Sequence, residues 1–155
     1  MISLIIPAFN EEESIGKTVE SAKSLLKNLK IKKSEIIVIN DGSTDKTEEN
    51  AKKKGARIIT HPQNQGYGFA LKNGIRNAKY KTIIITDADQ TYPLVEVPKL
   101  YHEYTKGFDM VVGERTGYSE SFFKIFLRKI LKFVVEFAAG KNIPDINSGL
   151  RIFDR

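Results

Sequence analysis

The sequence contains no cysteine and only two histidines. Disulfides, thiolate metal sites and cysteine nucleophiles are therefore excluded, and a histidine-rich metal centre is not expected. Long hydrophobic runs are also missing: no stretch approaches the ~20 apolar residues needed to cross a bilayer, so no spanning segment is expected. The first residues combine a short apolar run with acidic side chains and no basic leader, so we do not expect a signal peptide.

The composition predicts one globular domain over residues 1–155. Hydrophobic residues make up 41% of the chain and charged residues 28%, which is typical of a folded domain and not of a disordered tail. The net charge of +6 favours an anionic partner, which by charge alone is a nucleic acid, a phosphorylated ligand or an anionic membrane surface.

Short apolar runs rich in β-branched residues alternate with polar, helix-favouring stretches. The runs predict strands at 2–6, 35–40, 57–60, 81–86 and 108–113. The stretches between them predict helices at 12–30, 43–54, 66–79 and 95–106. The second helix is expected to begin with Ser43, Thr44 and Asp45 as capping residues. This alternation predicts an α/β fold with a mostly parallel central sheet flanked by helices.

The segment 121–140 has a different pattern, in which an apolar helix carries one narrow polar stripe. Lys124, Arg128, Lys132 and Glu136 are four residues apart, and Lys129 lies beside them. The helix is expected to pack against its own domain, to lie at a membrane surface with its cations toward the headgroups, or to pack against chain beyond this sequence. Residues 151–155 resemble the start of another element, so we expect the domain to be C-terminally truncated.

Polar and acidic side chains follow four of the predicted strands. Because ligands of open α/β sheets bind at the carboxyl ends of the strands, these segments are the candidate site. They are Pro7-Ala8-Phe9-Asn10-Glu11, Asn40-Asp41-Gly42-Ser43-Thr44-Asp45, Asp87-Ala88-Asp89 and Gly113-Glu114-Arg115.

Asp87 and Asp89 are the candidate metal ligands. On an extended chain, residues two apart point to the same side, so the two carboxylates are expected to converge. Hard oxygen ligands suit Mg²⁺ or Mn²⁺, and such an ion can neutralise charge on a departing diphosphate. The alternative is that the two acids cap the next turn or the helix after Pro93.

The segment from Asn40 to Ser43 closes a strand before a helix. Gly42 permits a positive φ or a close backbone approach, and Asp41 is expected to be free to accept hydrogen bonds from a base or ribose. The alternative is an Asp-Gly turn with a capping hydroxyl. A dinucleotide fingerprint at 64–68 is excluded, because Leu71 replaces the third glycine and the segment follows the third predicted strand.

Taken in order, four motifs resemble those of family 2 glycosyltransferases with the GT-A fold. They are Pro7–Glu11, Asn40–Asp45, Asp87–Asp89 and the segment Asp145-Ile146-Asn147-Ser148-Gly149-Leu150-Arg151. The likeness is greatest to the dolichol-phosphate mannosyltransferase and polyprenyl-phosphate glycosyltransferase branch, and it covers nearly the whole chain.

The resemblance implies a nucleotide-diphosphate sugar as donor, GDP- or UDP-linked, and a divalent metal, Mg²⁺ or Mn²⁺. Asp87 and Asp89 would handle the metal and the diphosphate. The donor-binding residues would be Pro7, Phe9, Asn10, Glu11, Asn40, Asp41, Gly42, Ser43, Asp87 and Ala88.

On the acceptor side, the resemblance implies a lipid-linked phosphate and inversion at the anomeric carbon. Arg115 matches an arginine that holds the acceptor phosphate, Ser148 matches an acceptor-side residue, and Arg128 or Lys129 would add a second cation. A phosphate needs no strong base, whereas a hydroxyl acceptor would, and Asp145 is the candidate for that role. Catalysis would thus involve Asp89, Arg115 and, for a hydroxyl acceptor, Asp145.

Two positions depart from the family pattern. Thr91 stands where the branch usually has a glutamine that helps to ligate the metal, and Gln90 sits one position early. Asn40 stands where many relatives have an aspartate, which bears on base or ribose contacts.

The alternatives to this function are a sugar nucleotidyltransferase, a non-catalytic binding fragment and a nucleic-acid-binding protein. A sugar nucleotidyltransferase normally needs a glycine-rich basic loop after the first strand, whereas residues 9–13 are acidic and lack glycine. A fragment that binds a nucleotide sugar without turnover is the non-enzymatic alternative. Nucleic acid is not expected as a partner, because the aromatic residues of 121–140 are too many and too apolar. The expected location is cytoplasmic, at the cytoplasmic face of a membrane with peripheral contact.

Overall fold

The structure is a computed structural model that describes residues 1–113 and 148–155. The helix expected at 121–140 and the candidate residues Arg115, Arg128, Lys129 and Asp145 lie outside the described residues.

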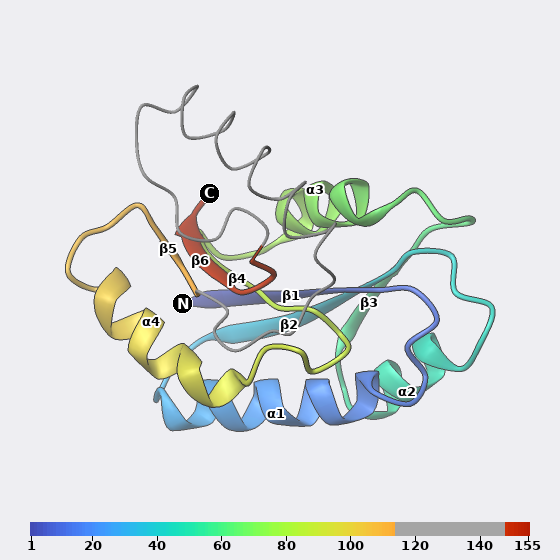
Figure 1. Cartoon of the computed structure of the whole chain (residues 1–155), viewed down its shortest axis with the longest axis horizontal. Helices are drawn as coiled ribbons and strands as arrows, with labels where there is room; N and C mark the ends of the chain where they lie inside the picture. Colours follow the sequence, from blue (N-terminus) through green and yellow to red (C-terminus); the bar gives the residue numbers. More distant parts are fainter. Residues whose placement is uncertain (114–147) are drawn as a thin grey trace, which may run out of the picture.

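Six strands form one sheet in the order β3-β2-β1-β4-β6-β5 (Figure 1). They are β1 (Ile2–Ala8), β2 (Ser34–Asn40), β3 (Arg57–Thr60), β4 (Thr82–Ile85), β5 (Met110–Val112) and β6 (Arg151–Asp154). β1 pairs in parallel with β2 and β4, and β2 pairs in parallel with β3, which confirms the mostly parallel sheet. β6 is antiparallel to both β4 and β5.

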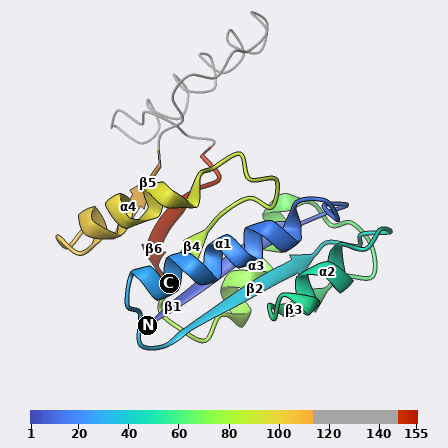
Figure 2. The same cartoon turned by 90° about the horizontal axis from the view of Figure 1, so that it is seen from below.

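Helices cover both faces of the sheet. α3 (Tyr67–Asn77) lies on one face, and α1 (Ile15–Asn28), α2 (Thr47–Lys53) and α4 (Val97–Tyr104) lie on the other (Figures 1 and 2). A short 3₁₀ helix, Leu94–Glu96, precedes α4. Every residue of β1 is buried, because its alternate side chains enter two separate apolar clusters, one on each face. This two-sided burial explains why the strands are continuous apolar runs without alternation.

α1 packs through one stripe of apolar side chains at helical spacing, comprising Ile15, Val19, Ala22, Leu25 and Leu26. α3 approaches the sheet through Gly74: a Cβ there would lie 2.6 Å from Ile5 Cγ2 and 3.2 Å from Ile39 Cγ1. Only glycine permits this close approach of helix and sheet.

The predicted helix at 43–54 begins four residues late. α2 starts at Thr47 with Lys46 as its N-cap residue, and no side chain caps it there. Ser43 and Asp45 accept hydrogen bonds from the backbone of a neighbouring loop, as described below, and Asp45 Oδ1 also accepts the Thr47 N–H at 2.9 Å, so the expected capping contact to the first turn is made by Asp45.

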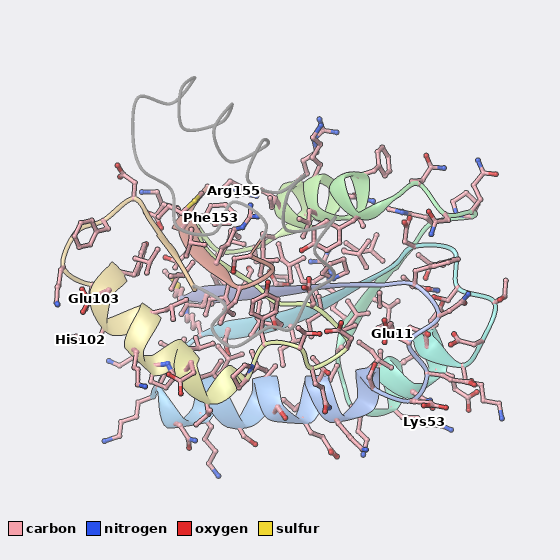
Figure 3. All side chains as sticks on the ribbon, viewed as in Figure 1. Glu11, Lys53, His102, Glu103, Phe153 and Arg155 are labelled. Atoms are coloured by element: carbon pink, nitrogen blue, oxygen red, sulfur yellow. The ribbon has the colours of Figure 1, made fainter. Side chains whose placement is uncertain are left out.

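β6 lies where the sequence indicated the start of another element at 151–155, but the sequence pattern did not assign that element as a strand. It runs between β4 and β5, and Phe153 packs against the cluster shared with α3. The Arg155 guanidinium donates to the carbonyls of Ile75 at 3.1 Å and Ala78 at 3.0 Å, at the end of α3 (Figure 3). Residues 151–155 therefore join β4 to β5 and tie the sheet to α3. Within the described residues, no helix is long and apolar enough to cross a membrane.

Candidate active site

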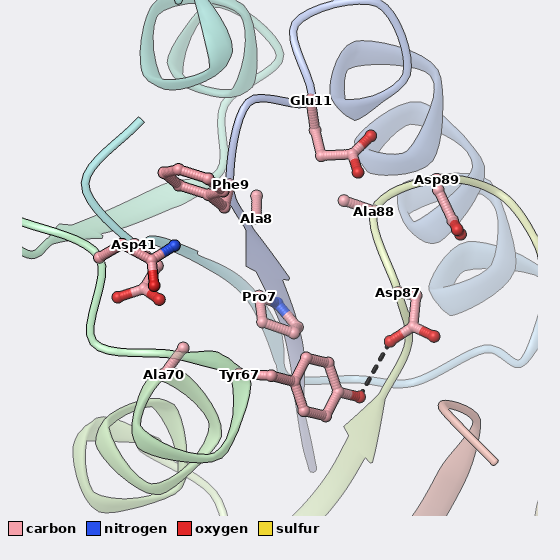
Figure 4. Close-up of a pocket in the computed structure, with 11 residues that line it drawn as sticks. Pro7, Ala8, Phe9, Glu11, Asp41, Tyr67, Ala70, Asp87, Ala88 and Asp89 are labelled. Atoms are coloured by element: carbon pink, nitrogen blue, oxygen red, sulfur yellow. Dashed lines mark hydrogen bonds between the residues drawn. The ribbon is translucent and has the colours of Figure 1, made fainter. Parts of the chain in front are cut away.

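A cavity of about 300 Å³ opens at the carboxyl ends of β1, β2 and β4 (Figure 4). Seven of the predicted site residues line it: Pro7, Phe9, Glu11, Asp41, Asp87, Ala88 and Asp89. Ala8, from the first candidate segment, also lines it, as do Asn64, Tyr67 and Ala70, which were not predicted. The loops that follow three parallel strands therefore converge on one space, as the strand-end rule predicts.

Asn10 and Ser43, which were predicted to bind the donor, join two loops instead of lining the cavity. The Asn10 backbone N–H donates to Ser43 Oγ at 3.0 Å, and the Thr44 N–H donates to Asn10 Oδ1 at 2.9 Å. Asn10 has a φ of 54°, a left-handed conformation that asparagine tolerates better than most residues.

The same two loops are joined by further hydrogen bonds, among them one from the Lys46 N–H to Glu12 Oε2 at 3.0 Å. The Glu11 N–H donates to Thr47 Oγ1 at 2.7 Å, and the Glu12 N–H donates to Asp45 Oδ2 at 3.0 Å. We call this set of contacts between residues 10–12 and 43–47 the loop clasp. It fixes the backbone that carries Phe9 and Glu11 into the cavity, and the Ser14 hydroxyl, which donates to Glu11 Oε2 at 2.6 Å, orients that carboxylate.

Asn40 and Gly42 determine the conformation of the loop that follows β2. Asn40 is buried; its Oδ1 accepts the Ser43 N–H at 3.1 Å and its Nδ2 donates to Glu48 Oε2 at 3.0 Å. Gly42 has a φ of 74°, and a Cβ there would lie 2.5 Å from the Gln63 carbonyl carbon. Neither residue lines the cavity, so their predicted donor contacts remain untested predictions.

Asp41 is not free, in contrast to the expectation from sequence. Its Oδ1 accepts the Gln65 N–H at 3.0 Å and lies 2.6 Å from His61 Nδ1, while its Oδ2 accepts the Gly66 N–H at 2.8 Å. Burial by itself would raise the pKa of Asp41, but the hydrogen bonds from His61 and the two amides lower it below its usual value. Asp41 therefore anchors the loop that leads into α3, and any contact with a donor would use its remaining acceptor capacity.

His61 receives a second contact from α3. Asn77 Nδ2 donates to Asn73 Oδ1 at 2.7 Å, which leaves the Asn73 amide group to donate to His61 Nε2 at 2.7 Å. This assignment places the ring proton on Nδ1, facing Asp41.

Asp87 and Asp89 line the same cavity, but not on an extended chain. β4 ends at Ile85, and residues 88–89 form a turn in which Gln90 has a φ of 63°. The Asp89 Oδ1 accepts the Thr91 N–H at 2.9 Å, so the expected extended backbone was wrong and the alternative of a turn cap holds for this oxygen, although both carboxylates line one cavity as expected. Thr18 of α1 fixes the turn by donating from its hydroxyl to the Ala88 carbonyl at 2.8 Å.

The donor set of this turn fits Mg²⁺ or Mn²⁺ shared with a diphosphate. Magnesium is commonly held by one or two carboxylates, with phosphate oxygens and waters completing its six ligands. Asp87 and Asp89 supply two carboxylates to one cavity, and the described residues contain no cluster of three or more acidic or histidine side chains that would form a metal site of protein ligands alone.

Tyr67 and Gly149 contact Asp87, and the sequence reasoning missed both. The Tyr67 hydroxyl donates to Asp87 Oδ1 at 2.9 Å, and burial together with the Asp87 charge raises the pKa of Tyr67 above its usual value. A Cβ on Gly149 would lie 2.0 Å from Asp87 Oδ2. The available signals were the segment at 64–68, which contains Gly66 and Gly68, and the Ser-Gly pair at 148–149.

Ser148, the predicted acceptor-side residue, is buried. Its hydroxyl lies 3.2 Å from both the N–H and the carbonyl oxygen of Leu150, and its carbonyl accepts from Arg151 Nε at 2.8 Å. The structure brings Ser148 next to the Asp87 region through Gly149, and its acceptor role remains a prediction.

An open, mostly parallel sheet with a ligand-sized, carboxylate-lined cavity at its strand ends defines an α/β domain that binds ligands at those ends. The chain belongs to glycosyltransferase family 2: the profile described as "Glycosyl transferase family 2" matches residues 3–155.

Individual relatives agree with this family. The chain is 38% identical over 162 residues to an uncharacterized protein of Methanocaldococcus jannaschii, MJ1222, covering 98% of this chain and 64% of that protein. It is 29% identical to a dolichyl-phosphate hexose transferase of Haloferax volcanii, covering 99% of this chain and 66% of that protein. The chain thus spans slightly less than two thirds of these relatives.

Among solved structures, the chain is similar to glucosyl-3-phosphoglycerate synthase of Mycobacterium tuberculosis in complex with Mn²⁺ and UDP-glucose. The TM-score is 0.76 and the identity 25%, over 99% of this chain and 56% of that one. This similarity confirms the predicted GT-A fold.

Proposed function

We propose that this chain forms the donor-binding part of a metal-dependent, inverting glycosyltransferase that moves a sugar from a GDP- or UDP-linked donor to a polyprenyl (dolichyl) phosphate. The observation that carries the proposal is the convergence of Asp87, Asp89 and Phe9 on one cavity. The named relatives support the substrate classes, because one is a dolichyl-phosphate hexose transferase and a structural neighbour holds Mn²⁺ with UDP-glucose.

Each lining residue has a chemical role in this proposal. Phe9 is 46% exposed, so its ring offers an apolar face on which a nucleoside base would stack. Asp87 and Asp89 would hold a divalent ion, whose charge offsets that of the departing nucleoside diphosphate. The loop clasp keeps Phe9 and Glu11 in place before the donor arrives, which lowers the ordering cost of binding.

The transfer is a direct displacement. An acceptor phosphate oxygen forms a bond to the anomeric carbon as the bond from that carbon to the diphosphate oxygen breaks, with inversion. The phosphate is already anionic, so orientation matters more than a base. Arg115, Arg128, Lys129 and Asp145 keep their predicted acceptor-side roles as proposals. So do the peripheral membrane contact and the cytoplasmic location.

A nucleotide-sugar-binding domain without turnover is the second candidate. It is supported by the cavity itself, because Phe9, Asp87 and Asp89 would serve donor binding without transfer equally well. The sugar nucleotidyltransferase alternative has no such support, since the loop after β1 carries Glu11, Glu12 and Glu13 and no glycine.

Thermal unfolding with GDP- and UDP-sugars, each with Mn²⁺, Mg²⁺ or a chelator, tests the proposal. A donor at 100 times its dissociation constant adds about 2.7 kcal/mol of stability, so one nucleotide with metal should raise the melting temperature clearly. The matched variant is Asp89→Asn, which keeps the Oδ1 that accepts the Thr91 N–H but removes the charge.

Asp89→Asn should lose the metal-dependent shift while its ligand-free stability stays within about 0.5 kcal/mol of wild type. Adding polyprenyl phosphate then separates transfer from binding alone. If no donor shifts the wild-type melting temperature with either metal, the proposal is wrong.

A further inference from the structure

The Asp87 carboxylate is enclosed by two groups from distant parts of the chain. Tyr67 stands in the first turn of α3, after Gly66 with a φ of 89°, and its hydroxyl donates to Asp87 Oδ1 at 2.9 Å (Figure 4). Tyr67 is 49% exposed and lines the cavity, so this bond is not a product of core packing.

Gly149 closes the opposite side. A Cβ at this position would lie 2.0 Å from Asp87 Oδ2, 2.5 Å from Cγ and 2.7 Å from Oδ1, so the carboxylate rests directly against the Gly149 backbone. The Gly149 N–H donates to the Tyr92 hydroxyl at 2.6 Å, a buried contact that fixes the glycine. Neither the Tyr67 hydroxyl nor the Gly149 backbone is a conventional metal ligand. Together they restrict the rotation of the Asp87 carboxylate, which is one.

We infer that Tyr67 is a positioning residue that orients the Asp87 carboxylate toward a divalent ion bound with the donor, with Gly149 as the backing surface. The inference rests on the proposed function, because it assigns Asp87 to that ion. Hydrogen bonds that orient a metal ligand typically change metal affinity by about 10–100-fold when removed.

Two roles of Tyr67 can be distinguished by substitution: its hydroxyl orients Asp87, and its ring lines the cavity. Tyr67→Phe keeps the ring that lines the cavity and removes only the hydroxyl that reaches Asp87. A wall residue would retain its function in this variant, whereas a positioning residue would lose it. Tyr101→Phe is the matched control, since Tyr101 packs against Tyr104 on α4 and does not line the cavity.

The experiment measures the Mn²⁺ dissociation constant by electron paramagnetic resonance of free Mn²⁺, in the presence of GDP or UDP. Nucleotide affinity in chelator and the melting temperature are measured beside it. Tyr67→Phe should weaken Mn²⁺ binding about 10–100-fold without changing the other two quantities. Tyr101→Phe should change none of the three. Gly149→Ala should weaken Mn²⁺ binding as well, because its methyl group displaces the carboxylate.

The possible results distinguish the role of Tyr67 from the proposed function. Wild-type Mn²⁺ affinity in Tyr67→Phe would overturn the inference and leave the proposed function standing. Equal losses of Mn²⁺ affinity and of metal-free nucleotide affinity would show that the hydroxyl serves the nucleotide and not Asp87, which also overturns it. A wild-type protein that binds no Mn²⁺ with either nucleotide would overturn both the inference and the metal dependence of the proposed reaction.

Discussion

The two sides of the cavity are built in different ways. On the side of β1 and β2, the polar motif residues Asn10, Ser43 and Asn40 form hydrogen bonds within the protein and do not line the cavity. On the side of β4, Asp87 and Asp89 both line the cavity. The motifs of this chain therefore contain residues that shape loops and residues that face the cavity. The two kinds should respond differently to mutation: the first through stability, the second through ligand binding.

The largest loss of stability is expected at Gly42. Gly42→Ala places a methyl group 2.5 Å from the Gln63 backbone at a positive φ, so it should cost about 2–4 kcal/mol in the free energy of unfolding. Gly68→Ala is the control, because nothing lies within 4 Å of its Cβ position inside α3, and it should stabilise the protein by about 0.5–1 kcal/mol. Urea unfolding of both variants measures the difference, and equal stabilities would refute the tight loop junction.

Asn40→Asp is expected to have the next largest effect. The aspartate keeps the acceptor for the Ser43 N–H but sets a carboxylate against Glu48, so stability should fall by about 1–3 kcal/mol. The double variant Asn40→Asp/Glu48→Gln should recover most of the loss, because a glutamine amide can donate to the new carboxylate. A double-mutant cycle by urea unfolding measures this coupling, and strictly additive effects would contradict it.

Asp41→Asn should have the smallest effect of the three and a distinct pH dependence. It should cost about 1–2 kcal/mol at pH 7, because the anion accepts three hydrogen bonds. The folded-state pKa is lowered, so this stabilisation is present above the unfolded pKa of about 3.9 and is lost as the pH falls through the folded value. The stability difference from wild type should thus shrink below about pH 4, and a difference that grows there would be inconsistent with a lowered pKa.

Much of the fold could be predicted because its determinants are local. The apolar runs at 2–6 and 35–40 mark strands, since side chains on both faces of β1 and of most of β2 must be buried. β6 was not assigned as a strand because four residues are too few to show a clear periodicity. Its position also depends on pairing with β4 and β5. Such pairing between distant segments leaves no periodicity in the sequence.

In the site, too, features set by local sequence could be predicted, and contacts between distant segments could not. The strand-end rule identified the loops that meet, and therefore Phe9, Asp87 and Asp89. It could not show that Ser43 would accept from Asn10, because that bond joins residues 33 positions apart. Nor could it identify Tyr67, whose relation to Asp87 exists only once α3 has packed on the sheet.

The central position of β6 has a consequence for the order of folding. During synthesis, β1 to β4 can pair as they emerge, but β4 and β5 acquire the strand between them only after residues 151–154 have been made. Until then β4 presents an open edge, which is a hazard for aggregation. Gly149 is made just before β6, so its contact with Asp87 is expected to form together with the pairing of β6 and β4. Formation of the carboxylate site is thereby coupled to the insertion of β6 into the sheet.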